Sequence, residues 1–120
     1  MFYTEKVYKS KLYTREIFCT PLYDAVERLL WHIDPVCFKC CSRPSEYGIE
    51  VIDIVSNLFN CRSGSDVKEL FCEVIVWWFY KESEDPIRYT PDEYFEDLYE
   101  FYLLNPVPII RVPVEETGEG

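Results

Sequence analysis

A proline directly after a threonine marks two places where helices can begin in this 120-residue chain: Thr20-Pro21 and Thr90-Pro91. A threonine hydroxyl can cap a helix, and proline at the first helical position loses no hydrogen bond. Each pair is followed by apolar residues that recur at helical spacing. We therefore predict helices over residues 20–33 and 90–104.

Further local signals refine the ends of these two helices. Glu93 follows Thr90 at the spacing of a capping box, which predicts that Thr90 is the N-cap of the last helix. Asp34 precedes Pro35, and a residue before proline is pushed out of the helical region. The first helix should therefore end at this point.

Two segments in the middle of the chain also have helical periodicity, but they are rich in β-branched residues. Residues 44–59 and 65–80 have apolar residues at helical spacing, with Ser45 and Ser65 as candidate N-caps and Gly64 as the break between them. We predict helices here. Strands over residues 49–59 and 73–80 are the alternative.

The two ends of the chain have a different character. Residues 1–19 are rich in Tyr, Thr, Val and Ile and alternate in polarity, which predicts a β-hairpin. Three prolines exclude a helix after residue 104 and favour an extended edge segment. We expect a single α+β domain over residues 1–120, with a hairpin (1–19), a helical body of about four helices (20–104), an extended segment (105–114) and a tail (115–120).

Composition limits where such a chain can reside. Hydrophobic residues make up 48%, so the chain can bury a core, yet no apolar run approaches the ~20 residues that a membrane helix needs. The first residues are charged and lack the apolar core of a signal peptide. We expect an intracellular protein with no membrane contact.

The amino-acid usage is also biased. The chain has no Gln, three Asn and a single Ala, while Glu, Tyr, Val, Ile and Pro are frequent. Depletion of amides with enrichment of charge and proline is typical of proteins that work at high temperature. Our hypothesis is a protein of a hyperthermophilic archaeon or of one of its viruses, in which case it would act in the host cytoplasm.

Charge is unevenly distributed along the chain, and this favours a protein partner. The net charge is −10, and the first 43 residues carry a small positive balance while the rest is strongly acidic. An acidic protein is a poor binder of nucleic acid, because phosphate contacts supply most of that affinity. Our first hypothesis is a non-catalytic interaction protein that binds a basic surface of a host or viral protein, with a homodimer as an option. The acidic face of the last helix would carry this activity: Glu93, Glu96, Asp97 and Glu100, with Glu82, Glu84 and Asp85 upstream.

A basic and aromatic N-terminal stretch supports a second hypothesis. Its cations could meet single-stranded nucleic acid while its tyrosines stack on bases. The chain would then be a nucleic-acid-binding module, with a structural zinc as an option. The residues concerned are Lys6, Lys9, Lys11 and Arg15.

The six cysteines have three interpretations. An even number of cysteines, taken with the thermophile-like composition, favours disulfides, with Cys37, Cys40, Cys41, Cys61 and Cys72 as candidates. Buried free thiols are the second interpretation, and Cys19 and Cys72 suit it best. A zinc site is the third and weakest, because one CxxC motif is a poor signal; its ligands would be His32, Cys37, Cys40 and Cys61.

Catalytic signals are few. No phosphate-binding, zinc-protease or nucleophile-elbow motif occurs, and we predict neither a cofactor nor an enzyme. A third hypothesis keeps a small enzyme open. It would use either the pair of His32 and Cys37 or a carboxylate at Glu73, which lies within an apolar run.

Overall fold

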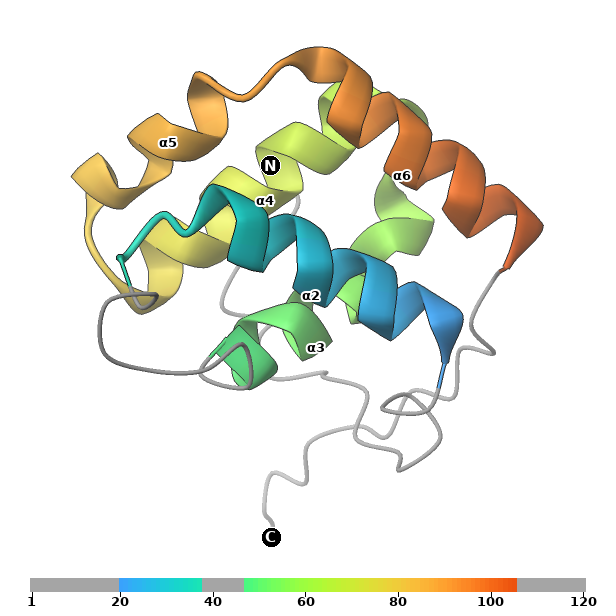
Figure 1. Ribbon diagram of the computed structural model, residues 1–120, viewed down its shortest axis with the longest axis horizontal. Coiled ribbons are helices and arrows are strands. Elements are labelled where there is room, and N and C mark those ends of the chain that lie inside the picture. The colour runs from blue at the N-terminus through green and yellow to red at the C-terminus, as the bar shows by residue number, and fades with distance from the viewer. Residues whose placement is uncertain (1–19, 38–46, 106–120) are drawn as a thin grey trace, which may run out of the picture.

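The computed structural model describes residues 20–37 and 47–105. These residues form five α-helices and two short 3-10 helices (Figure 1). In chain order they are α2 (Pro21–Ile33), α3 (Gly48–Asn57), η4 (Leu58–Asn60), α4 (Gly64–Trp78), η5 (Lys81–Glu84), α5 (Asp85–Arg88) and α6 (Asp92–Leu104).

The α+β prediction is wrong, because the described part of the chain is all-α and contains no strand. Both central segments are helices, α3 and α4, so the strand alternatives for residues 49–59 and 73–80 are wrong as well. Burial explains why these β-branched residues form a helix: α3 is buried on nearly every side, and tertiary packing outweighs the small differences in helix propensity. The predicted hairpin (1–19) and nearly all of the extended segment (105–114) lie outside the described residues.

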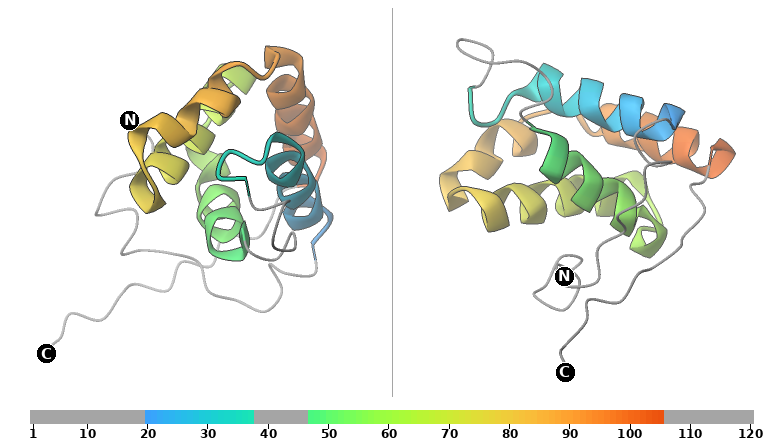
Figure 2. Two further views of the ribbon diagram at one scale, coloured as in Figure 1. Left: turned by 60° about the vertical axis from the view of Figure 1, so that its left-hand side comes forward. Right: turned by 90° about the horizontal axis from the view of Figure 1, so that it is seen from below.

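The helices form two packed layers. Helices α2 and α6 lie on one side of α3 and α4, and they run in opposite directions, as the colour order in Figure 1 and the views in Figure 2 show. The most extensive helix contact joins α4 to α6, while α2 packs mainly on α3. Helices α2 and α6 contact each other only in part.

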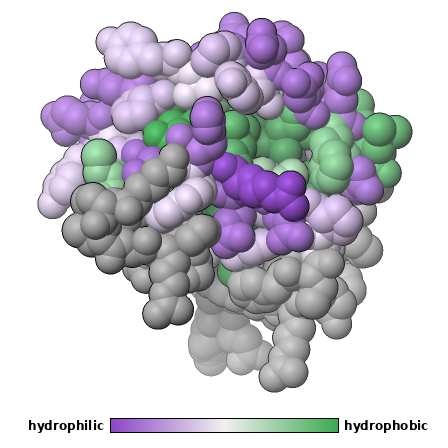
Figure 3. All heavy atoms as spheres, viewed as in Figure 1, coloured by the Kyte–Doolittle hydropathy of each residue, from purple (hydrophilic) through white to green (hydrophobic). Residues whose placement is uncertain are grey.

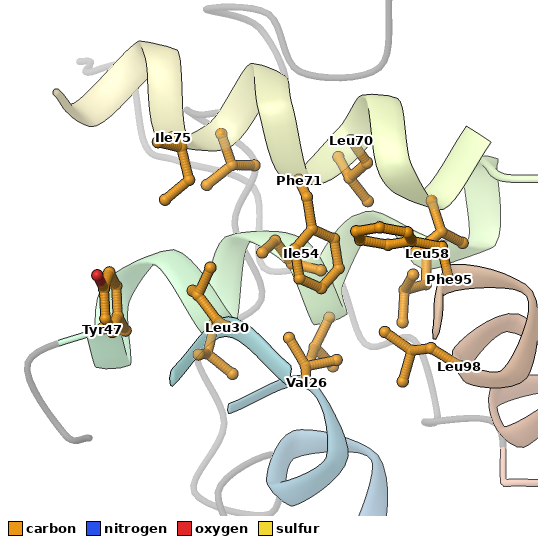
Figure 4. Close-up of a cluster of buried hydrophobic side chains, with 14 of the residues drawn as sticks. Val26, Leu30, Tyr47, Ile54, Leu58, Leu70, Phe71, Ile75, Phe95 and Leu98 are labelled. Carbon is orange, nitrogen blue, oxygen red and sulfur yellow. The ribbon is translucent and has the colours of Figure 1, made fainter. Parts of the chain in front are cut away.

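One hydrophobic core joins all of the longer helices. Val26 and Leu30 of α2 meet Ile54 of α3, while Phe71 of α4 meets Phe95 of α6 (Figure 4). The Phe71 and Phe95 rings pack edge to face, with centroids 5.3 Å apart and an interplanar angle of 80°. Aromatic pairs prefer this arrangement, which adds about 0.5–1.5 kcal/mol beyond the burial of their area.

The predicted ends of α2 are confirmed. The Thr20 hydroxyl accepts a hydrogen bond from the Tyr23 backbone N–H at 3.1 Å, so Thr20 is the N-cap. Asp34 ends the helix in the left-handed conformation, with φ of 51°. Its carboxylate accepts a 2.7 Å hydrogen bond from the Tyr47 hydroxyl, which in turn accepts one from the Val36 N–H. The end of α2 is thereby fixed to the residue that precedes α3.

Three predicted caps are wrong. Helix α3 begins at Gly48, and Tyr47 rather than Ser45 is its N-cap. Helix α4 begins two residues earlier than expected: Ser63, not Ser65, is the N-cap, and its hydroxyl accepts a hydrogen bond from the Asp66 N–H. Thr90 does not cap α6, whose N-cap is Pro91. The Thr90 hydroxyl instead donates to the Pro86 carbonyl at 2.8 Å. The acidic segment before it, residues 81–88, forms η5 and α5.

Gly64 is the first residue of α4 rather than a break, and it has a tertiary role. A Cβ atom at this position would lie 2.6 Å from Cγ and 2.7 Å from Cα of Glu96. Glycine therefore allows the start of α4 to approach the backbone of α6 closely.

We expect Gly64→Ala to destabilise the protein by about 1–3 kcal/mol, the usual range for overpacking, because the backbone of α6 must move to admit the methyl group. Gly48→Ala is the matched control, since its Cβ would make an ordinary 3.5 Å contact with the Tyr23 hydroxyl. Urea unfolding of both variants tests this. Equal stability of the two variants would contradict the close approach.

We expect Ser63→Ala to cost about 1 kcal/mol of stability, the usual loss for an N-cap side chain. Ser65→Ala is the control, because Ser65 is exposed within the first turn and alanine has the highest helix propensity. That variant should be neutral or slightly more stable. Thermal unfolding distinguishes the two, and the reverse order would place the start of α4 at Ser65.

Candidate functional site

The acidic face of α6 consists of Glu93, Glu96, Asp97 and Glu100, and all four side chains are exposed. Their orientation follows from the opposite side of the helix, where Phe95 and Leu98 are buried against the core. Helix α6 contains no Lys or Arg. No ion pair joins any of the four to another residue of the described part of the chain.

Other acidic residues are neutralised by cations. Arg88 donates hydrogen bonds to Glu84 and to Glu69, and Lys68 forms a 2.8 Å ion pair with Asp92. The Arg88 pKa is raised by these two carboxylates, so the cation persists at any ordinary pH. The predicted acidic surface is thus divided: Glu84 is paired, while the exposed acidic face of α6 keeps its charge uncompensated.

The remaining two members of the predicted surface belong to other elements. Glu82 lies in η5 and Asp85 begins α5, and both are exposed. Their elements pack on α4 rather than on α6. They are therefore not part of the acidic face of α6.

An open groove adjoins the acidic face, between α6 and α2. Figure 3 shows hydrophobic side chains gathered in a band between the two helices, with hydrophilic side chains on either side. The groove contains two neighbouring hollows of about 250 and about 360 Å³. Their lining residues are Pro21, Asp24, Ala25, Arg28 and Leu29 of α2 with Tyr94, Asp97, Leu98 and Phe101 of α6. One residue of the acidic face, Asp97, thus also borders an apolar hollow.

The alternative site on the N-terminal stretch lies outside the described residues. This applies to Lys6, Lys9, Lys11 and Arg15 together. The nucleic-acid hypothesis therefore stays a prediction.

The described cysteines form no disulfide with one another. Cys61 and Cys72 are buried free thiols, and burial raises the pKa of each to about 12. The structure therefore does not support Cys61 and Cys72 as disulfide candidates, and Cys72 instead matches the second interpretation, a buried free thiol. Cys37 is exposed just after α2, whereas Cys19, Cys40 and Cys41 lie outside the described residues. A disulfide that involves one of those three stays a prediction.

The weak zinc alternative gains no support. Within residues 20–37 and 47–105, no group of three His, Cys, Asp or Glu side chains is placed to hold a metal ion. His32 is exposed and its ring lies against that of Tyr94, with centroids 5.6 Å apart. Cys61 is buried, and Cys40 lies outside the described residues.

Sequence reasoning missed a group of buried polar residues on α3. Asp53 is fully buried, and its carboxylate accepts a 2.6 Å hydrogen bond from the Trp78 indole N–H at the end of α4. Glu50 and Asn57 are buried on the same helix. The signal was available, because Glu50, Asp53 and Asn57 recur at helical spacing among apolar residues. By contrast Glu73, the carboxylate that the sequence singled out, is only half-buried.

The two buried thiols predict how stability responds to alkaline pH. An unfolded thiol ionises near its ordinary pKa of about 8.5, whereas Cys61 and Cys72 hold their protons to about pH 12 in the folded protein. Above about pH 8.5 the unfolded chain therefore binds fewer protons than the folded one, and stability falls as pH rises. Urea unfolding of the wild type and of the Cys61→Ala, Cys72→Ala double variant between about pH 8 and 11 measures this slope.

The double variant should show a shallower slope, whatever its absolute stability. Burial also raises the pKa values of Tyr23, Tyr47 and the half-buried Tyr102, and these hydroxyls contribute to the slope of both proteins. Identical slopes would mean that the thiols are accessible to water in the folded state.

Comparisons with known proteins identify no relative. No protein-family model matches the chain, and neither a curated protein nor a solved structure matches it. None of the described helices is long and apolar enough to cross a membrane.

Proposed function

We propose that the chain is a small, acidic, non-catalytic interaction protein that binds a basic surface of a protein partner through the acidic face of α6. One observation carries the proposal. The carboxylates that lie near cations in this fold are paired, as Glu84 and Asp92 are, while those of the acidic face are exposed and uncompensated.

The acidic face also carries an energetic cost. Its four residues form like-charge pairs at spacings of three and four residues, and each such pair destabilises a helix by about 0.2–0.5 kcal/mol. Glu100 adds to this because a negative charge near a helix C-terminus opposes the helix dipole. A cationic partner would offset this repulsion on binding.

Charge of this kind acts mainly on recognition and on the rate of encounter. A surface of one sign attracts partners of the opposite sign and disfavours wrong ones. The overall charge of −10 has the same sign as the face and extends this attraction. The same charge disfavours binding to nucleic acid, which supports a protein partner.

The test is a variant that removes charge and keeps shape: Glu93→Gln, Asp97→Asn and Glu100→Gln. Immobilised wild type and variant are compared for the basic proteins that they retain from cells of the source organism, at low and at physiological salt. We expect the wild type to retain such a partner, more weakly as salt rises, because exposed charges are screened over about 8 Å at physiological ionic strength. The variant should lose the partner and yet be as stable as the wild type or more so, because like-charge pairs are removed.

A second variant tests whether binding depends on where the charges lie or only on the total charge of the protein. Glu115→Gln, Glu116→Gln and Glu119→Gln change the net charge equally but leave α6 untouched. It should retain the partner. If both variants lost the partner equally, only the total charge would matter, and if neither did, the acidic face would serve solubility alone.

A further inference from the structure

The groove between α2 and α6 is an unfilled space between two antiparallel helices. The C-terminal end of α2 meets the start of α6 where the rings of His32 and Tyr94 lie together. From there the two hollows extend along the helices to Pro21 and Phe101. Each helix has 13 residues, so the groove can follow a helix for at most about 20 Å.

The floor of the groove is apolar and is widened by one small side chain. Leu98 is buried, Leu29 and Phe101 are half-buried, and all three face the space that the two hollows occupy. Ala25 lines both hollows and is the only alanine of the chain. A larger residue at this position of α2 would occupy the space between the helices.

The border of the groove is predominantly negative. Asp24 and Asp97 line it from opposite helices, and Arg28 is the cation among the lining residues of the described chain. Glu93 and Glu100 lie on the outer side of α6, one turn before and one turn after Asp97. A segment that entered the groove would therefore meet carboxylates along its α6 side.

We propose that this groove binds a basic amphipathic helix of the protein partner. Apolar side chains spaced three or four residues apart would lie on the floor beside Ala25 and Leu98, and Lys or Arg side chains would reach Asp97 and its acidic neighbours. Amphipathic helices bind hydrophobic grooves in this way. A second copy of this chain is a poor occupant, because its own acidic face would meet the same carboxylates.

This inference rests on the proposed function and names the part of the partner that the site recognises. The acidic face alone would bind any cationic surface. The groove adds a requirement for an apolar stripe of helical spacing, so the two contributions can be separated with peptides.

The probe is a synthetic peptide of about 18 residues, long enough to follow the groove, with Leu at helical spacing and Lys elsewhere on an Ala background. A scrambled peptide of the same composition is its control. Fluorescence anisotropy measures affinity at low salt, and nuclear magnetic resonance shift mapping locates the site. We expect the amphipathic peptide to bind about tenfold or more tightly than the scrambled one, since it buries leucine side chains. The shifted amides should centre on Ala25, Leu29, Leu98 and Phe101.

Variants of the protein then test the groove itself. Ala25→Leu fills the hollow without changing charge and should weaken the amphipathic peptide about tenfold while leaving the scrambled peptide unchanged. Ala25 is half-buried beside open space, so the variant should fold; Ala25→Val is the smaller replacement if it does not. Leu104→Ala is the matched control, because Leu104 is 81% exposed and does not line the groove.

The outcomes separate the inference from the proposed function. In one outcome, both peptides bind equally and in a salt-sensitive way, and the variant with Glu93→Gln, Asp97→Asn and Glu100→Gln binds neither. This outcome would overturn the groove proposal and support the acidic-face proposal. Preferential binding that Ala25→Leu does not weaken would also overturn the groove. Absence of binding by either peptide at low salt would overturn both.

Discussion

The close packing of α6 on α4 is the contact on which the rest of the described structure depends. Phe95 lies against Phe71 edge to face, and the missing side chain of Gly64 lets the two backbones approach. An isolated helix of 13 residues is marginal in water, so α6 exists because this packing stabilises it. The same contact fixes the rotation of α6, which directs Glu96 and Glu100 to solvent and Tyr94 and Phe101 toward α2.

A few polar contacts hold the remaining helix ends. Tyr47 is fully buried and connects the end of α2 to the start of α3 through Asp34. Asp53 connects α3 to the end of α4 through the indole N–H of Trp78. A buried carboxylate is costly unless it accepts hydrogen bonds, so each of these contacts stabilises one arrangement of the helices over its alternatives.

Sequence patterns predicted the local features of this fold better than the tertiary ones. Thr20-Pro21 and Asp34-Pro35 locate α2 because caps and proline act within a few residues. Gly64 was misinterpreted as a break, since its reason is the backbone of α6, about thirty residues away, and no local pattern reports such a contact. The start of α4 was misplaced for a local reason: Ser63 and Ser65 flank that glycine, and a serine at either position can cap a helix.

The residues of the candidate site also divide into those that local patterns predicted and those that they missed. The exposed face of α6 was predicted, because four carboxylates alternate with apolar residues at helical spacing. The groove was not, because it is formed by two helices about seventy residues apart in the chain, and its signal is a space rather than a pattern. The one indication of the groove in the sequence is Ala25, a small residue among the larger apolar residues of α2.

Energetics explain how the fold can carry such a face. The like-charge pairs on α6 together cost about 1–2 kcal/mol. Full burial of Phe95 and near-full burial of Leu98 each contribute about 1.5–3 kcal/mol. Packing therefore outweighs repulsion, and the carboxylates lie on the side of the helix that makes no contribution to the core. The fold therefore tolerates four like charges on the solvent side of α6 without needing them for its stability.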